Sequence, residues 1–112
     1  MNYEFRVSPS FMRAAKALAK RYPSLKVDLN NLRQELIANP FQGVDLGGGM
    51  RKIRMAITSK GKGKSAGARV ITINVIISSS NMVIGLIYIY DKSDAANVRA
   101  ATMRKIVKEM GL

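Results

Sequence analysis

Two apolar segments separated by a short polar turn constrain the fold of this chain more than any other feature. Arg69 to Ile77 (RVITINVII) is rich in β-branched side chains, and Met82 to Tyr90 (MVIGLIYIY) is apolar at nearly every position. Both segments have the composition and length of strands, and the residues SSSN between them are typical of a turn. The sequence therefore predicts an antiparallel strand pair, whose second strand is central in the sheet and covered on both faces.

A third segment, Met50 to Ile57 (MRKIRMAI), alternates between apolar and other side chains. Side chains of a strand point alternately to its two faces, so one face carries three apolar residues and the other carries Lys52, Arg54 and Ala56. Two cations therefore share one face of this predicted strand. The segment before it, Gly43 to Gly49 (GVDLGGG), is rich in glycine and is interpreted as a loop.

The N-terminal third predicts a short strand followed by two helices. Asn2 to Val7 has the pattern of a strand, after which Ser8 can cap a helix with Pro9 at its first position. Ser24 can cap a second helix, whose leucines recur at intervals of three and four residues until Asn39-Pro40 ends the pattern. We expect these two helices to form a helical hairpin.

A last helix is predicted from Ser93 or Asp94 to the glycine at position 111. The predicted order of elements is βααβββα, which gives an α+β fold with a mainly antiparallel sheet and a helical hairpin packed on it. At 112 residues, 47% of them apolar, the chain has the size and composition of one folded unit, and we expect a single domain over residues 1–112.

The charge of the chain indicates a polyanionic partner. Nineteen Lys and Arg residues stand against seven Asp and Glu residues, which gives a formal net charge of +12. Nucleic acid is the simplest explanation for self-repulsion of that size. The alternative is a basic protein whose charge serves only its solubility.

Residue types that are missing exclude several kinds of site. The chain has no Cys and no His, which excludes disulfides, thiolate and imidazole metal ligands, and the commonest proton shuttle. The carboxylates are scattered apart from Asp91 and Asp94, to which a helix-capping role is assigned, so we expect neither a metal nor a cofactor. The longest apolar run is about half of the ~20 residues that span a bilayer, and no signal peptide is evident. We expect a soluble, cytoplasmic protein without a membrane partner.

The sharpest local feature is the segment from Ser59 to Arg69 (SKGKGKSAGAR), which holds four cations and three glycines in eleven residues. Glycines let backbone N–H groups approach phosphate oxygens, Lys60, Lys62 and Lys64 supply mobile charges, and the Arg69 guanidinium can hold phosphate in two places. The alternative is a flexible loop made soluble by its lysines. A nucleotide-binding P-loop is excluded, because Thr58 stands where the pattern needs glycine and no helix follows.

Two stretches resemble a known family. The block GMRKIRMAITSKGKGKSAGARVITI (residues 49–73), with YDKSD (residues 90–94) after a later strand, is similar to the RelE/HigB toxins of toxin–antitoxin systems. The resemblance implies a compact RelE-like, microbial RNase-like α+β fold. It also implies a ribosome-dependent endoribonuclease that cuts translated messenger RNA, inhibits translation and is silenced by a HigA-like or RelB-like antitoxin.

The family's basic positions can be carried over residue by residue. By this resemblance the catalytic cations are Lys52, Arg54 and Arg69, and the RNA-binding cations are Lys60, Lys62, Lys64 and Lys92.

The chain also departs from the family's pattern. Met50 and Ala66 replace the usual Leu and Gly, and Arg99 stands where RelE itself has a C-terminal tyrosine. Tyr90 is therefore the aromatic candidate for proton transfer. Its alternative role is structural, and Tyr88 shares both interpretations.

The expected reaction is attack of a ribose 2′-hydroxyl on the adjacent phosphorus, in which fixed cations stabilise the charge that builds on the phosphate oxygens. Arg54 and Arg69 would stabilise this charge, and Lys52 or a loop lysine would accept the proton. Two alternatives remain open. One is a ParE-like toxin that binds DNA gyrase without catalysis, and the other is a basic RNA-binding module.

Overall fold

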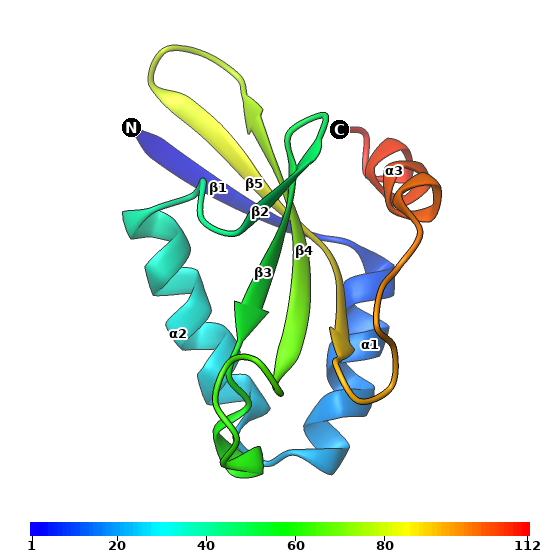
Figure 1. The fold of residues 1–112 in the computed structure, drawn as a ribbon. Coiled ribbons are helices and arrows are strands. Elements are labelled where there is room, and N and C mark those ends of the chain that lie inside the picture. Colours follow the sequence, from blue (N-terminus) through cyan, green and yellow to red (C-terminus); the bar gives the residue numbers. More distant parts are fainter.

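The sheet is built around β5 (Asn81–Asp91), which has a neighbouring strand on each side and helices over both faces (Figure 1). The computed structural model describes residues 1–112 and contains a five-stranded mixed sheet in the order β1-β5-β4-β3-β2. β1 runs parallel to β5, and all other neighbours are antiparallel. The other elements are β1 (Asn2–Val7), α1 (Pro9–Arg21), α2 (Leu25–Ala38), β2 (Val44–Gly47), β3 (Met50–Met55), a single 3-10 turn (Thr58–Lys60), β4 (Ala68–Ile76) and α3 (Ala100–Glu109).

The two faces of the sheet carry separate apolar clusters. α1 and α2 meet at a short turn, diverge along one face (Figure 1), and bury Phe11, Leu18 and Leu36 against it. On the other face, α3 buries Met103 and Val107 against β3, β4 and β5. The expected α+β class, the antiparallel β4–β5 pair and the central, doubly covered strand are therefore confirmed. None of the three helices is long and apolar enough to cross a membrane.

The loop prediction for Gly43 to Gly49 is wrong, because this segment contains β2. Gly47 and Gly48 have φ values of +87° and +61°, a backbone region that glycine enters without steric cost, and they turn the chain back onto β3. The observed order is therefore βααββββα, with one more strand than predicted. The apolar alternation in β2 is only four residues long, too short to distinguish from a loop.

The last helix begins later than predicted, at Ala100 instead of Ser93 or Asp94. The two predicted caps are occupied by other partners. The Ser93 hydroxyl donates to the Asp91 carboxylate at 2.6 Å, and the Asp94 carboxylate accepts a hydrogen bond from Arg21 at 2.7 Å. These contacts hold residues 91–94 in a turn, so the chain reaches α3 through an irregular segment.

The two predicted N-caps behave differently. Ser8 is fully buried, and its hydroxyl accepts a hydrogen bond from the Phe11 amide at 2.9 Å while donating to the Ile87 carbonyl at 2.5 Å. It therefore caps α1 as predicted and also ties that helix to β5. Ser24 makes no capping bond to the backbone of α2. Its hydroxyl instead donates to the Asp28 carboxylate at 2.8 Å.

Replacement of Ser8 by alanine should lower the free energy of unfolding by about 2 kcal/mol, because the helix cap is lost and the Ile87 carbonyl loses its partner. Chemical denaturation of the purified protein measures this difference. Ser10→Ala, two residues further along in the first turn of α1, is the matched control and should change the stability by less than about 0.5 kcal/mol. Equal effects of the two substitutions would contradict the double role of Ser8.

Candidate nucleic-acid interface

Strand register brings three predicted catalytic residues into one row. Arg54 of β3 pairs with Arg69 of β4, and Arg69 pairs with Tyr90 of β5. Directly paired residues project from the same face of a sheet, so these side chains are neighbours across three strands. Lys52 lies two residues from Arg54 on the same strand and therefore shares this face. It is the face that α3 partly covers.

A β-bulge decides that the β5 tyrosines belong to this row. The register between β4 and β5 shifts after Ile71, which pairs with Tyr88, while Thr72 pairs with Leu86 and leaves Ile87 as the extra residue. Leu86 packs toward α1 and α2, whereas Ile87, Tyr88 and Tyr90 all contact the α3-side cluster. The bulge thus reverses the alternation of β5. Without it, Tyr88 and Tyr90 would project under the helical hairpin.

Lys52 and Arg54 are the free cations of the row. Arg54 is exposed and Lys52 is partly exposed, and neither side chain makes a hydrogen bond or an ion pair within the protein. Their side chains are about 7 Å apart along the strand, given a rise of ~3.3 Å per residue. Both can therefore reach a ligand laid along β3.

The segment from Ser59 to Arg69 forms the basic loop, and the side chain of Arg69 lies underneath it. Its side chain is only 6% exposed, and one terminal nitrogen donates to the Lys64 and Ala68 carbonyls at 3.1 and 3.2 Å. The other terminal nitrogen donates to the Ser65 carbonyl at 2.9 Å. The guanidinium that was predicted to hold phosphate therefore holds the backbone of residues 64–68 in this structure.

Lys60 also faces inward. Its ammonium group donates to the Asp91 carboxylate at 2.7 Å, to the Ala66 carbonyl at 2.8 Å and to the Ser93 hydroxyl at 2.9 Å, which uses all three of its N–H bonds. Lys62 and Lys64 are exposed and make no side-chain contact of this kind. The loop therefore presents two of its four cations to solvent.

The loop is joined to three other parts of the fold. The Asp28 carboxylate of α2 accepts from the Thr58 amide at 2.9 Å, and the Ser24 hydroxyl accepts from the Ser59 amide at 2.8 Å. At its other end, Gly67 packs so closely on β3 that an added Cβ would lie 2.2 Å from the Met55 carbonyl oxygen. The Gly67 carbonyl accepts from the Lys92 amide at 3.0 Å. Lys92 itself has an exposed side chain without a partner.

Tyr90 is buried, with 5% of its surface exposed, and its hydroxyl has no hydrogen-bond partner. Burial raises the pKa of this phenol, and the nearby Arg69 charge offsets only part of that rise, so the hydroxyl stays protonated at neutral pH. Tyr88 lies beside it with a centroid distance of 6.4 Å and an interplanar angle of 26°. A protonated, unpartnered phenol fits a proton donor and does not fit a base.

Asp91 is the residue that sequence reasoning missed, having assigned it a helix-capping role. Its carboxylate is completely buried and accepts hydrogen bonds from Lys60, Ser93 and Tyr22, with Arg21 at 3.3 Å. Burial alone would raise the pKa of this carboxyl, but the hydrogen bonds from Lys60, Ser93 and Tyr22 outweigh it and hold the pKa well below its ordinary value. Asp91 is therefore ionised. The local pattern Asp-x-Ser signals only the turn, because Lys60 and Tyr22 are distant in sequence.

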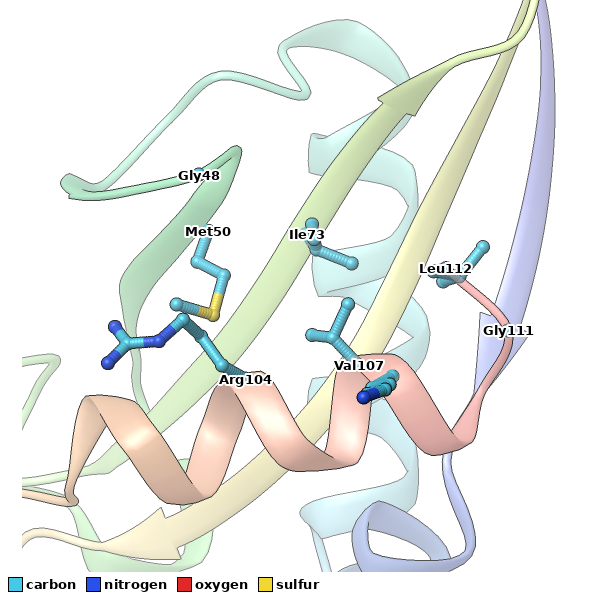
Figure 2. Close-up of a pocket in the computed structure, with 8 residues that line it drawn as sticks. Gly48, Met50, Ile73, Arg104, Val107, Gly111 and Leu112 are labelled. Atoms are coloured by element: carbon cyan, nitrogen blue, oxygen red, sulfur yellow. The ribbon is translucent and has the colours of Figure 1, made fainter.

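The line of free cations continues onto α3. Figure 2 shows Arg104 projecting from α3 beside Met50, and both residues line a hollow of about 450 Å³ between α3 and the β2–β3 turn. Met50 precedes Lys52 by two residues on the same strand face. At the other end, Arg54 and Lys64 line one small hollow, which Asp28 and Glu35 of α2 also line. We call this line the basic strip, which consists of Arg104, Lys52, Arg54, Lys64 and Lys62.

The strip has the chemistry of a phosphate-binding surface. Its members are cations without internal partners, and no group of three or more acidic side chains is arranged to hold a metal ion. A polyanion laid along β3 would meet successive positive charges, with Arg54 offering a planar fork and the lysines offering point charges. No protein-family model matches this chain, and no curated protein matches it either. Its function is therefore inferred from the geometry and charge of the strip together with the sequence motifs.

Alanine substitutions at the two paired arginines should have opposite effects on stability. Arg69→Ala should lower the free energy of unfolding by about 2 kcal/mol, because it removes charge-assisted hydrogen bonds to three carbonyls. Arg54→Ala should leave the stability unchanged or raise it slightly, since like charges directly opposite on neighbouring strands repel each other. Denaturant unfolding of both variants provides the comparison. An Arg69→Ala variant as stable as the parent would show that the carbonyl contacts do not hold the loop.

Proposed function

We propose that this protein binds RNA along the basic strip and cleaves it, as a translation-inhibiting toxin of the RelE/HigB kind with a RelE-like fold. The observation that carries the proposal is the division of the cations on this face. Lys60 and Arg69 are held inside the protein, while Lys52, Arg54, Lys62 and Lys64 have no internal partner. Free cations gathered on one face, on a chain with a net charge of +12, suit a polyanionic ligand.

The cost of this arrangement supports an external partner. Arg54 stands directly opposite Arg69, and like charges in that position destabilise a sheet. The carbonyls that surround Arg69 reduce the repulsion, but Arg54 makes no ion pair that would supply a counter-charge. A bound phosphate would supply that counter-charge. RNA is favoured over DNA by the resemblance of residues 49–73 to RNA-cleaving toxins.

The proposed cleavage transfers a phosphoryl group within the RNA strand. The ribose 2′-oxygen forms a bond to phosphorus while the bond to the leaving 5′-oxygen breaks, and the 2′ proton passes to the proposed general base, Lys52. Arg54 stabilises the charge that develops on the nonbridging oxygens. Tyr90 is the candidate donor to the leaving oxygen. The Tyr90 hydroxyl is buried in this structure, so it has to be uncovered before the phenol reaches RNA.

The proposed partners are messenger RNA on the translating ribosome and a cognate antitoxin. A strip made of cations supplies charge stabilisation but few proton-transfer groups, so substrate positioning by the ribosome would contribute much of the catalysis.

A second candidate is an RNA-binding module without catalytic activity. It is favoured by the burial of Tyr90 and by the internal contacts of Arg69, which leave mainly point charges on the surface. Such groups bind phosphate well and transfer protons poorly.

Neutralising the strip should weaken RNA binding far more than neutralising the opposite side of the molecule. A Lys52→Gln, Arg54→Gln, Lys64→Gln variant should bind a single-stranded 20-nucleotide RNA about 100-fold more weakly, which corresponds to about 1 kcal/mol for each lost contact. The slope of log affinity against log salt concentration should fall by about 2, since each phosphate of a single strand contributes about 0.7. Fluorescence anisotropy at several salt concentrations measures both quantities.

The matched control carries the same change of charge at Arg13, Lys16 and Arg33, which are exposed on α1 and α2. Its affinity should fall by less than about fivefold, because salt screens charges more than ~8 Å from the bound phosphates. Equal losses in the two variants would mean that only net charge matters, and would refute the strip.

Primer extension on messenger RNA from translating ribosomes decides between the two candidate functions. The wild-type protein should generate new 5′ ends within coding regions, and Arg54→Ala should generate at least tenfold fewer, because it removes the free guanidinium from the row. RNA binding without new ends would leave the non-catalytic module. New ends that are insensitive to Arg54→Ala would place the catalytic centre elsewhere.

A further inference from the structure

The basic loop lacks the apolar contacts that usually order a loop. It contains three glycines and no apolar side chain larger than alanine. Fixing its backbone costs about 1–2 kcal/mol per residue in conformational entropy, and polar contacts have to offset that cost. Its strongest polar contacts are charge-assisted, and the Lys60 contact to Asp91 is the one that involves two opposite charges.

We propose that Asp91 is a positioning residue for the basic strip. It holds Lys60 and thereby fixes the basic loop, so that Lys62 and Lys64 extend the line begun by Lys52 and Arg54. The inference rests on the proposed function, since the direction of these lysines matters only if the strip binds RNA. It adds a role for a carboxylate, a group that by charge alone opposes RNA binding.

The surroundings of Asp91 make it a rigid anchor. It is completely buried at the end of β5, where Tyr22 and Arg21 at the end of α1 and the Ser93 hydroxyl all donate to it. These donors hold the carboxylate in place independently of Lys60. The Lys60 side chain is 13% exposed and also spans the loop to the Ala66 carbonyl. One ammonium group therefore joins both arms of the loop to the end of β5.

A loop fixed in this way binds more tightly than a mobile one with the same charges. A mobile loop has to lose its conformational freedom when RNA binds, and this loss subtracts from the binding free energy. A fixed loop has already lost that freedom during folding. The competing interpretation is that Lys60 leaves Asp91 when RNA binds and contacts phosphate directly. In that case Asp91 competes with phosphate for Lys60 and weakens binding.

The sign of the affinity change separates these interpretations. Asp91→Asn removes one negative charge, so electrostatics alone, or release of a phosphate-binding Lys60, predicts tighter binding to the single-stranded 20-nucleotide RNA. The positioning role predicts binding at least fivefold weaker despite the added positive charge. Glu109→Gln is the matched control, because Glu109 is exposed, has no partner and carries the same charge. It should leave the affinity unchanged or slightly raise it.

Lys60→Met provides a second test that does not require Asp91→Asn to fold. It keeps the aliphatic stem and removes the contact to Asp91, so it should weaken binding at least fivefold without changing the salt slope. Lys62→Met is its control and should lower the slope by about 0.7, because Lys62 contacts phosphate. A slope that falls equally in both variants would identify Lys60 as a phosphate ligand and overturn the proposal.

Hydrogen exchange of the RNA-free protein tests the fixed loop independently of function. The Lys60 amide donates to the Ile57 carbonyl at 2.8 Å and the Gly61 amide to the Thr58 carbonyl at 3.0 Å. In Asp91→Asn and in Lys60→Met both amides should exchange at least tenfold faster relative to the amides of α2, and the double variant should add little. Unchanged loop exchange, or tighter RNA binding by Asp91→Asn, would overturn the proposal. If the wild type does not bind RNA at all, the proposed function fails, while loop exchange still decides whether Asp91 fixes the loop.

Discussion

The pairing of β4 with β5 is the interaction on which both the core and the candidate site depend. β5 is covered on both faces, and its apolar side chains join the two clusters that hold α1 and α2 on one side and α3 on the other. The bulge at Ile87 then reverses which side chains face each side of the sheet in the last residues of β5. Because of this one extra residue, Tyr88 and Tyr90 lie in register with Ile71 and Arg69 on the face that also carries the free cations. A bulge beside a functional surface commonly re-aims side chains in this way.

Charge in this molecule is divided between an internal and an external role. Lys60 and Arg69 belong to the motif by sequence, yet both donate to groups of the protein and act as cross-links for a loop that glycine would otherwise leave mobile. Their neighbours Lys62 and Lys64 are left exposed by the same contacts. The inward cations thus determine where the outward cations lie. A count of positive charges in the segment overstates how many can contact a ligand and hides why the others are needed.

Sequence reasoning succeeded where a pattern has a local cause. The alternation in residues 50–57 placed Lys52 and Arg54 on one face, and the apolar run of β5 identified the central strand, because burial imposes both patterns directly. It failed where the cause is a distant partner. The β5 bulge left no trace in a segment that is apolar on both faces, and the burial of Arg69 depends on carbonyls of a loop whose path the sequence does not state. Asp91 was assigned to a helix cap because its partners Lys60 and Tyr22 lie 31 and 69 residues away.

The geometry of the row also limits which catalytic roles its residues could take in the proposed function. Arg54 and Lys52 are accessible and unpaired, so they can stabilise developing negative charge as soon as a phosphate is bound. The phenol of Tyr90 is protonated and in line with them but covered, and burying a hydroxyl without a partner costs about 1–3 kcal/mol. That cost would be recovered when the hydroxyl is uncovered and meets a hydrogen-bond acceptor, such as the leaving oxygen of a bound RNA. In the proposed mechanism the same step that uncovers Tyr90 completes the row, which couples proton transfer to correct placement of the substrate.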